Sequence, residues 1–139
     1  MAWLITGGAG YIGAHVVHAF RAAGGQCVVL DDLSAGIRSR VPTDVPFVKA
    51  DVLDADALDR VFTEHQIEGV VHLAGKKSVP ESVLRPELYQ RINTDGTTSL
   101  LDACLRHGVR HVVFSSTAAV YGIIESDVPV TETLARRIQ

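Results

Sequence analysis

Short apolar runs alternate with longer amphipathic segments along the chain. The apolar runs are rich in β-branched residues and occupy positions 2–6, 27–30, 46–49, 69–73 and 109–115. Runs of this length without polar alternation are typical of strands in a parallel sheet that is covered on both faces. The sequence therefore predicts five strands of a parallel sheet.

The segments between these runs carry apolar residues at helical spacing. One covers 11–23 before a Gly-Gly pair, the second covers 54–65 behind an acidic cap, and a long one covers 87–107 after a loop with Pro80 and Pro86. Right-handed strand–helix alternation gives an α/β fold with a doubly wound, Rossmann-like sheet ordered 3-2-1-4-5. We expect one domain over 1–122 and an irregular tail over 123–139.

A glycine-rich stretch, Thr6-Gly7-Gly8-Ala9-Gly10-Tyr11-Ile12-Gly13, joins the first strand to the first helix. Gly7, Gly10 and Gly13 suit a turn that brings backbone N–H groups against a pyrophosphate. Tyr11 and Ile12 then lie in the first helical turn, whose positive end points at the anion. The flanking strand and helix favour a dinucleotide-binding loop over a plain glycine-rich turn.

An acidic residue at the end of the second strand indicates which nucleotide is bound. Asp31 can accept hydrogen bonds from both hydroxyls of an adenosine ribose, and it repels a 2′-phosphate. NAD is therefore favoured over NADP as the cofactor. Asp32 adds to the repulsion, whereas Arg38 and Arg40 in the same loop could weaken it. The alternative for Asp31 is a solvated turn acid.

Small and polar residues follow the next strands, at the edge where ligands bind in open α/β folds. Asp51 and Val52 can meet the adenine, although a helix-capping role fits this acidic stretch equally well. Ala74 and Gly75 leave room for a dinucleotide. Lys77 can neutralise a phosphate or reach the nicotinamide ribose.

Hydroxyl and amide side chains complete the candidate site. Ser115 and Thr117 end the fifth strand, where a hydroxyl can bond to a substrate hydroxyl during hydride transfer. Capping of the strand end is the alternative for both. Asn93 either orients local backbone or is an ordinary helix-face residue. His72 is expected to be structural, because it lies at the base of the crevice.

Composition and charge narrow the range of partners. The chain has 139 residues and a formal charge of −3 without charged blocks, which argues against nucleic-acid binding and a polybasic membrane contact. It has no long apolar stretch, so a cytoplasmic protein without a membrane segment is expected. Cys27 and Cys104 are interpreted as buried hydrophobes. His15 and His18 have no third ligand at a suitable spacing, so no metal site is predicted.

The fifth predicted strand has no clear sixth strand after it in the sequence. We therefore expect residues 111–114 to form an exposed apolar edge of the sheet. Such edges pair readily with other chains, so self-association is predicted.

These motifs resemble the extended short-chain dehydrogenases/reductases, and among them the UDP-glucose 4-epimerases. The resemblance is carried by the stretches 6–13, 31–34, 51–52, 72–82, 93–96 and 114–122. A sugar-nucleotide dehydratase of this family usually has Asp-Glu after the position of Thr117, where this chain has Ala118-Ala119. A dehydratase function is therefore disfavoured.

The resemblance implies a tightly held NAD that takes a hydride from C4 of the hexose of a UDP-sugar. The hydride returns to the other face of a 4-keto intermediate, which interconverts UDP-glucose and UDP-galactose. Thr117 would contact the reacting hydroxyl. The implied cofactor contacts are Gly7, Gly10, Tyr11, Ile12, Gly13, Asp31, Asp32, Leu33, Ser34, Asp51, Val52, Leu73, Ala74, Gly75, Lys77, Asn93 and Ser115.

The resemblance also implies parts that this sequence lacks. The family's base is a tyrosine with a lysine four residues later, and this motif is expected beyond Gln139, as is the domain that grips the UDP-sugar. Tyr121 belongs to another element, and no lysine follows Lys77. The sequence thus predicts a truncated NAD-binding part of an epimerase, inactive on its own, with a homodimer as a further expectation. The alternatives are a non-catalytic NAD-binding module and another NAD-dependent sugar-nucleotide enzyme of the family.

Overall fold

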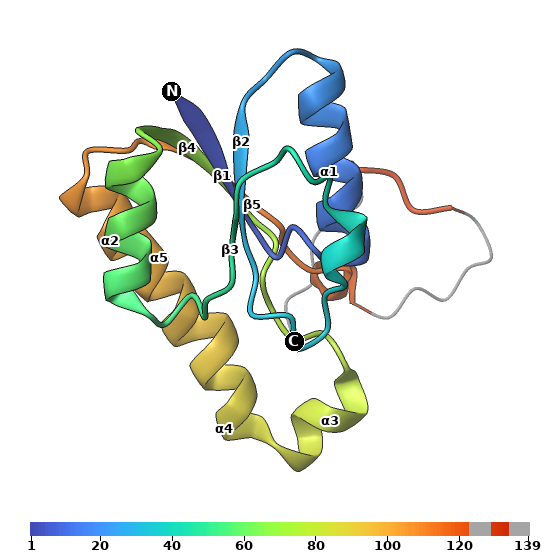
Figure 1. Ribbon diagram of the computed structural model, residues 1–139. Coiled ribbons are helices and arrows are strands. Elements are labelled where there is room, and N and C mark those ends of the chain that lie inside the picture. Colours follow the sequence, from blue (N-terminus) through green and yellow to red (C-terminus); the bar gives the residue numbers. More distant parts are fainter. Residues whose placement is uncertain (123–128, 134–139) are drawn as a thin grey trace.

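A five-stranded parallel sheet forms the centre of the computed structural model, which describes residues 1–122 and 129–133 (Figure 1). The strand order is β3-β2-β1-β4-β5, and every neighbouring pair is parallel. This confirms the predicted 3-2-1-4-5 sheet. The strands are β1 (Ala2–Thr6), β2 (Cys27–Leu30), β3 (Phe47–Val48), β4 (Ile67–His72) and β5 (His111–Phe114).

Helices cover the two faces of the sheet unequally. Helix α1 (Tyr11–Ala22) lies on one face, and α2 (Ala55–Glu64) and α5 (Gly96–Arg106) lie together on the other (Figure 1). The Asp54 side chain caps α2 by accepting a hydrogen bond from the Ala57 N–H at 2.9 Å. The predicted acidic cap of this helix is therefore confirmed.

Each helical layer encloses its own hydrophobic core. Leu4 of β1 packs in one cluster with Leu58 of α2 and Leu100 of α5. Its neighbour Ile5 packs in the second cluster with Val17 of α1. All five of these aliphatic side chains are fully buried. Consecutive strand residues point to opposite faces, so nearly every position of the central strands must be apolar.

The segment between β4 and α5 differs from the prediction. The predicted loop around Pro80 is a short helix, α3 (Val79–Leu84), because proline is tolerated in the first turn of a helix. The long helix begins at α4 (Pro86–Tyr89) and reaches α5 through a π-helical turn over Gln90–Asp95. A π-helical turn inside a helix is uncommon and often marks a functional site.

Strand β5 forms one edge of the described sheet, as predicted. Val112, Val113 and Phe114 are 38%, 53% and 57% exposed. Cys27 and Cys104 are buried free thiols, also as predicted, and burial raises the pKa of both. Among the described helices, none combines the length and the apolar character that a bilayer crossing needs.

A lysine on β5 should reduce self-association of the 139-residue chain. We expect Val113→Lys to lower the weight-average mass at high concentration, because a charged edge side chain opposes strand pairing. Thr63→Lys adds the same charge at an exposed position of helix α2 and is the control. Light scattering over a concentration series measures the effect. A wild-type chain that stays monomeric throughout would contradict the prediction.

Candidate functional site

The loops that follow the strands meet at the carboxyl edge of the sheet, because all five strands run in the same direction. The loop after β1 touches the loop after β4. A Cβ atom placed on Gly7 would lie 2.7 Å from the Ala74 nitrogen. This contact marks the position where the chain switches from one half of the sheet to the other, which is where doubly wound folds bind ligands.

The glycines of the first loop are required by close backbone packing. Gly7 has a φ of 70°, a conformation that side chains disfavour. A Cβ on Gly13 would lie 2.7 Å from the Gly8 Cα, so the helix could not pack against the loop. These two positions confirm that the spacing serves a tight turn and close helix packing.

The N-terminus of α1 presents backbone donors at the surface. Gly10 is its N-cap and provides no side-chain hydrogen bond, and the first turn contains no acidic residue. Tyr11 and Ile12, the first two helical residues, are 69% and 56% exposed. This end of the helix therefore keeps N–H groups and a positive dipole end available for an anion.

Asp31 lies buried beside this loop. Its Oδ2 accepts a hydrogen bond from the Ala9 N–H at 2.9 Å, and its Oδ1 accepts one from the Leu33 N–H at 2.8 Å. Only 7% of the residue is exposed. Asp31 is thus not a solvated turn acid. A carboxylate offers about four acceptor sites, so about two remain for ribose hydroxyls.

The loop after Asp31 is held in one conformation. Leu33 has a φ of 63°, which is unusual for a bulky residue and indicates strain of the kind found at binding sites. Asp32 accepts a hydrogen bond from the Ser34 N–H at 2.8 Å. The guanidinium of Arg38 donates to the Val41 carbonyl at 2.9 Å and lies over the phenyl ring of Phe47. Arg38 is therefore held by neutral groups, and among the described residues it forms no ion pair with Asp31 or Asp32.

The acidic stretch after β3 divides its roles among neighbouring residues. Asp51 accepts a hydrogen bond from the Leu53 N–H at 3.0 Å, which closes a turn. The helix cap is Asp54 and not Asp51. Val52 is 4% exposed and its side chain packs in the α2/α5 core, so only its backbone is available to a ligand.

Asn93 orients the loop after β4. From the π-helical turn, its Oδ1 accepts a hydrogen bond from the Lys76 N–H at 2.8 Å, and its Nδ2 donates to the Lys76 carbonyl at 2.9 Å. This pair of bonds fixes the backbone between Gly75 and Lys77. Both of these residues are exposed, whereas Leu73 and Ala74 are partly buried.

His72 lies beneath that loop and is 2% exposed. Its Nδ1 is 2.6 Å from Thr6 Oγ1, and its Nε2 is 3.1 Å from Thr97 Oγ1. Burial holds the pKa of His72 down to about 4. The expectation of a structural histidine at the base of the crevice is confirmed. Thr97 was missed by the sequence analysis, and its spacing of four residues from Asn93 is the only signal that could have indicated it.

The residues after β5 complete this edge of the sheet. The Ser115 N–H donates to the His72 carbonyl at 3.1 Å, which extends the pairing of β4 with β5. Thr117 is the N-cap of a short 3₁₀ turn over Ala118–Tyr121, and its hydroxyl accepts a hydrogen bond from the Ala119 N–H at 3.2 Å. In this structure Thr117 therefore acts as a cap, as the alternative interpretation predicted. Its side chain is exposed, so the hydroxyl is also accessible to a ligand.

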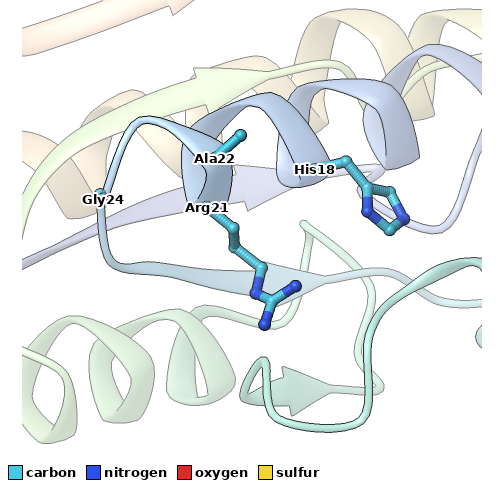
Figure 2. Close-up of a pocket in the computed structure, with 5 residues that line it drawn as sticks. His18, Arg21, Ala22 and Gly24 are labelled. Atoms are coloured by element: carbon cyan, nitrogen blue, oxygen red, sulfur yellow. The ribbon is translucent and has the colours of Figure 1, made fainter.

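The concave surface in Figure 2 lies at the opposite edge of the sheet. It surrounds the C-terminal end of α1 and is lined by His18, Arg21, Ala22, Gly24 and Gly25. Arg21 forms an ion pair with Asp44 there. This surface surrounds the C-terminal end of α1, whereas the candidate site lies at the N-terminal end of the same helix, so the two are separate.

Comparison with known proteins gives consistent matches. Residues 3–137 match the model of the NAD dependent epimerase/dehydratase family. A UDP-glucose 4-epimerase of Azospirillum brasilense is 55% identical over 129 residues, which cover 93% of this chain and 37% of that protein. The UDP-glucose 4-epimerase of Bacillus subtilis is 45% identical over an alignment that covers 95% of this chain and 41% of that protein. The chain thus spans well under half the length of these relatives.

Solved structures agree with the sequence relatives. The UDP-glucose 4-epimerase of Thermus thermophilus in complex with NAD has a TM-score of 0.90 and 40% identity, over 99% of this chain and 44% of that one. The Thermotoga maritima enzyme with UDP-glucose has a TM-score of 0.87 and 35% identity, and the match covers 99% of this chain and 45% of that one. The fold at the candidate site is therefore the same as in these enzymes.

Removing His72 should flatten the pH dependence of stability. The native pKa of about 4 lies below the usual 6.5, so between these values the unfolded chain binds a proton that the native chain excludes. Stability is therefore complete above pH 6.5 and falls as the pH falls toward 4. From pH 8 to pH 5, we expect the free energy of unfolding of His72→Gln to fall by about 2 kcal/mol less than that of the wild type. Urea unfolding at each pH measures this difference.

The exposed variant His15→Gln removes one imidazole outside the core and is the control. An equally steep decline for His72→Gln and the wild type would contradict the assignment of this titration to His72.

Proposed function

The chain belongs to the NAD dependent epimerase/dehydratase family, and from this we propose that it is the NAD-binding part of a UDP-glucose 4-epimerase. The observation that carries the proposal is the uncapped N-terminus of α1, packed through Gly7 and Gly13 and lying beside the buried Asp31 carboxylate. These features match the two ends of an adenosine diphosphate: an anion and a ribose diol.

The pyrophosphate is assigned to the loop after β1. Gly7, Gly10 and Gly13 let the backbone approach the anion, and Tyr11 and Ile12 offer their N–H groups to it. The net charge of the chain is −3, so local backbone donors must supply the attraction. A side chain at Gly7 or Gly13 would collide with neighbouring backbone atoms and distort this cradle.

The adenosine is assigned to the loops after β2 and β3. Asp31 has acceptor sites left after its two backbone hydrogen bonds, and these suit the ribose hydroxyls. The Arg38 guanidinium is held at the Val41 carbonyl and forms no ion pair with Asp31 or Asp32 among the described residues, which supports repulsion of a 2′-phosphate by this acidic pair. The residues assigned to this half are Asp31, Asp32, Leu33, Ser34, Asp51 and Val52.

The nicotinamide half is assigned to the loops after β4 and β5. Asn93 fixes the backbone at Lys76 and so presents the exposed Lys77 beside the crevice. The cofactor, when bound, supplies an acceptor for the hydride of sugar C4. Thr117 is assigned to the reacting hydroxyl. The residues assigned to nicotinamide binding are Leu73, Ala74, Gly75, Lys77, Asn93 and Ser115.

The proposed reaction interconverts UDP-glucose and UDP-galactose by reversible hydride transfer at C4. The 139 residues supply Thr117 but no lysine after Lys77 that could activate a tyrosine. A hydroxyl without a neighbouring base is a poor proton acceptor near neutral pH. We therefore assign the proton transfer to residues that lie outside this sequence, along with UDP-sugar binding. A homodimer is part of the proposal by analogy with the family.

Replacing Asp31 should weaken NAD binding and relax the selection against NADP. Asp31→Ala is expected to raise the Kd of NAD at least about tenfold, because hydrogen bonds to a charged group contribute roughly 1.5–3 kcal/mol. Asp31→Asn removes the charge and keeps one acceptor for the Ala9 N–H, but it loses the acceptor for the Leu33 N–H. Calorimetric titration with NAD and NADP measures both constants.

The exposed Asp102→Ala variant makes the same charge change far from the strand-end loops and is the control. An unchanged NAD-to-NADP preference in both Asp31 variants would show that the ribose is held elsewhere.

The isolated 139-residue chain should not epimerise UDP-galactose. We expect no UDP-glucose above the buffer blank after prolonged incubation with NAD, measured by chromatography, because the chain lacks an activated base. Turnover that Thr117→Val abolishes would overturn this and place the base within these residues.

A further inference from the structure

A continuous hydrogen-bonded chain runs beneath the candidate site, and its directions can be assigned. The Ala74 N–H donates to Thr6 Oγ1 at 3.4 Å, and the Leu73 N–H, which donates to the Thr6 carbonyl at 3.1 Å, also approaches Oγ1 at 3.3 Å. The Thr6 oxygen therefore accepts from the backbone, and its own proton points to the Nδ1 of His72 at 2.6 Å. His72 Nδ1 must then be the unprotonated nitrogen of the ring.

The other side of the ring gives the same answer independently. The Thr97 hydroxyl donates to the Asn93 carbonyl at 2.7 Å, so its oxygen is free to accept from the His72 Nε2–H at 3.1 Å. Both neighbours thus require the neutral Nε2–H tautomer. Burial favours the neutral ring as well, since it lowers the pKa of His72.

The chain ends on the backbone that carries the site. Asn93, whose carbonyl accepts from Thr97, is the residue whose side-chain amide holds Lys76 through two hydrogen bonds. Asn93 lies in the π-helical turn, where the regular i to i+4 pattern is interrupted. Thr97 lies in the first turn of α5 directly after this π-helical turn, so the His72–Thr97 bond ties that end of the turn to the sheet.

We infer that His72 is a positioning residue that acts through Thr97 and Asn93 to place the Lys76–Lys77 backbone for the nicotinamide half of the cofactor. The inference rests on the proposed function for the identity of the ligand. His72 itself is buried and leaves almost no surface for contact with a ligand. Its effect should therefore appear in the binding of NAD but not of a ligand that ends at the pyrophosphate.

Two adjacent threonines provide a matched pair of variants. Thr98 makes the same kind of bond as Thr97, from its hydroxyl to the carbonyl four residues earlier at 3.0 Å, but it is exposed and does not reach His72. Thr97→Val and Thr98→Val thus remove equivalent helix hydrogen bonds, and only the first leaves the His72 N–H without its partner. Thr97→Ser restores the hydroxyl.

The test compares the affinities of NAD and ADP for the 139-residue chain. We expect Thr97→Val to weaken NAD about fivefold to tenfold and to leave ADP within about twofold, because an unpaired buried donor displaces the turn that holds Lys76. Thr97→Ser and Thr98→Val should both bind NAD as the wild type does. Equal weakening of NAD and ADP, or wild-type NAD affinity in Thr97→Val, would overturn the inference.

A second measurement separates this inference from the proposed function. Imidazole ¹⁵N shifts report the tautomer of His72, and amide exchange reports the protection of the Lys76 N–H, both without any ligand. A wild-type chain that binds neither NAD nor ADP would reject the proposed function. In that case an Nδ1–H tautomer, or unchanged protection of the Lys76 N–H in Thr97→Val, would reject the inference as well. An Nε2–H tautomer together with lower protection in Thr97→Val would retain the link from His72 through Thr97 to the Lys76 backbone.

Discussion

Direct backbone contact between the loops after β1 and β4 is the constraint on which the rest of the site depends. Gly7 approaches the Ala74 nitrogen so closely that a Cβ atom could not fit between them. The contact brings the ends of two neighbouring strands together and leaves α1 to begin directly above them. Gly13 continues the same packing, since the first turn of the helix rests on the loop. A side chain at either glycine would separate elements that form opposite walls of the site.

The polar groups below this contact follow from it. Because β1 and β4 pair in register from Leu4 to Thr6, Thr6 and His72 lie side by side on the face that α5 covers. A buried imidazole needs partners for both nitrogens, and it finds them in Thr6 and Thr97. The sheet and the π-helical turn are thereby joined by polar bonds, in addition to the apolar packing around Leu100. A site built in this way has its lower wall fixed before any ligand arrives.

Much of the fold followed from sequence because local pattern and tertiary environment agree there. The five apolar runs are strands in the predicted order, with β5 as the exposed edge, and the glycine spacing is explained by contacts at Gly7 and Gly13. Helix α3 was missed because Pro80 has the same appearance in a loop and in a first helical turn. The engagement of Arg38 was missed for another reason: its partners are set by the path of the chain after β2, which no local pattern encodes.

The π-helical turn and Thr97 belong to the same class of unpredicted features. A threonine in the middle of a helix is ordinary in sequence, and its importance comes only from facing a histidine 25 residues earlier in the chain. Distant polar pairs of this kind are set by strand register and helix rotation together.

The two halves of the proposed site differ in how many of the groups they need lie within the described residues. The adenosine half is held by backbone contacts and by a carboxylate already fixed by Ala9 and Leu33, all within the described residues. The reactive half offers Thr117, whose hydroxyl accepts a bond from the Ala119 N–H on an exposed turn. Preorganised backbone can bind a cofactor by itself, but proton transfer needs a base held beside the reacting atom. Affinity for the cofactor and turnover of a sugar are therefore separable properties, and these 139 residues contain the elements of the first.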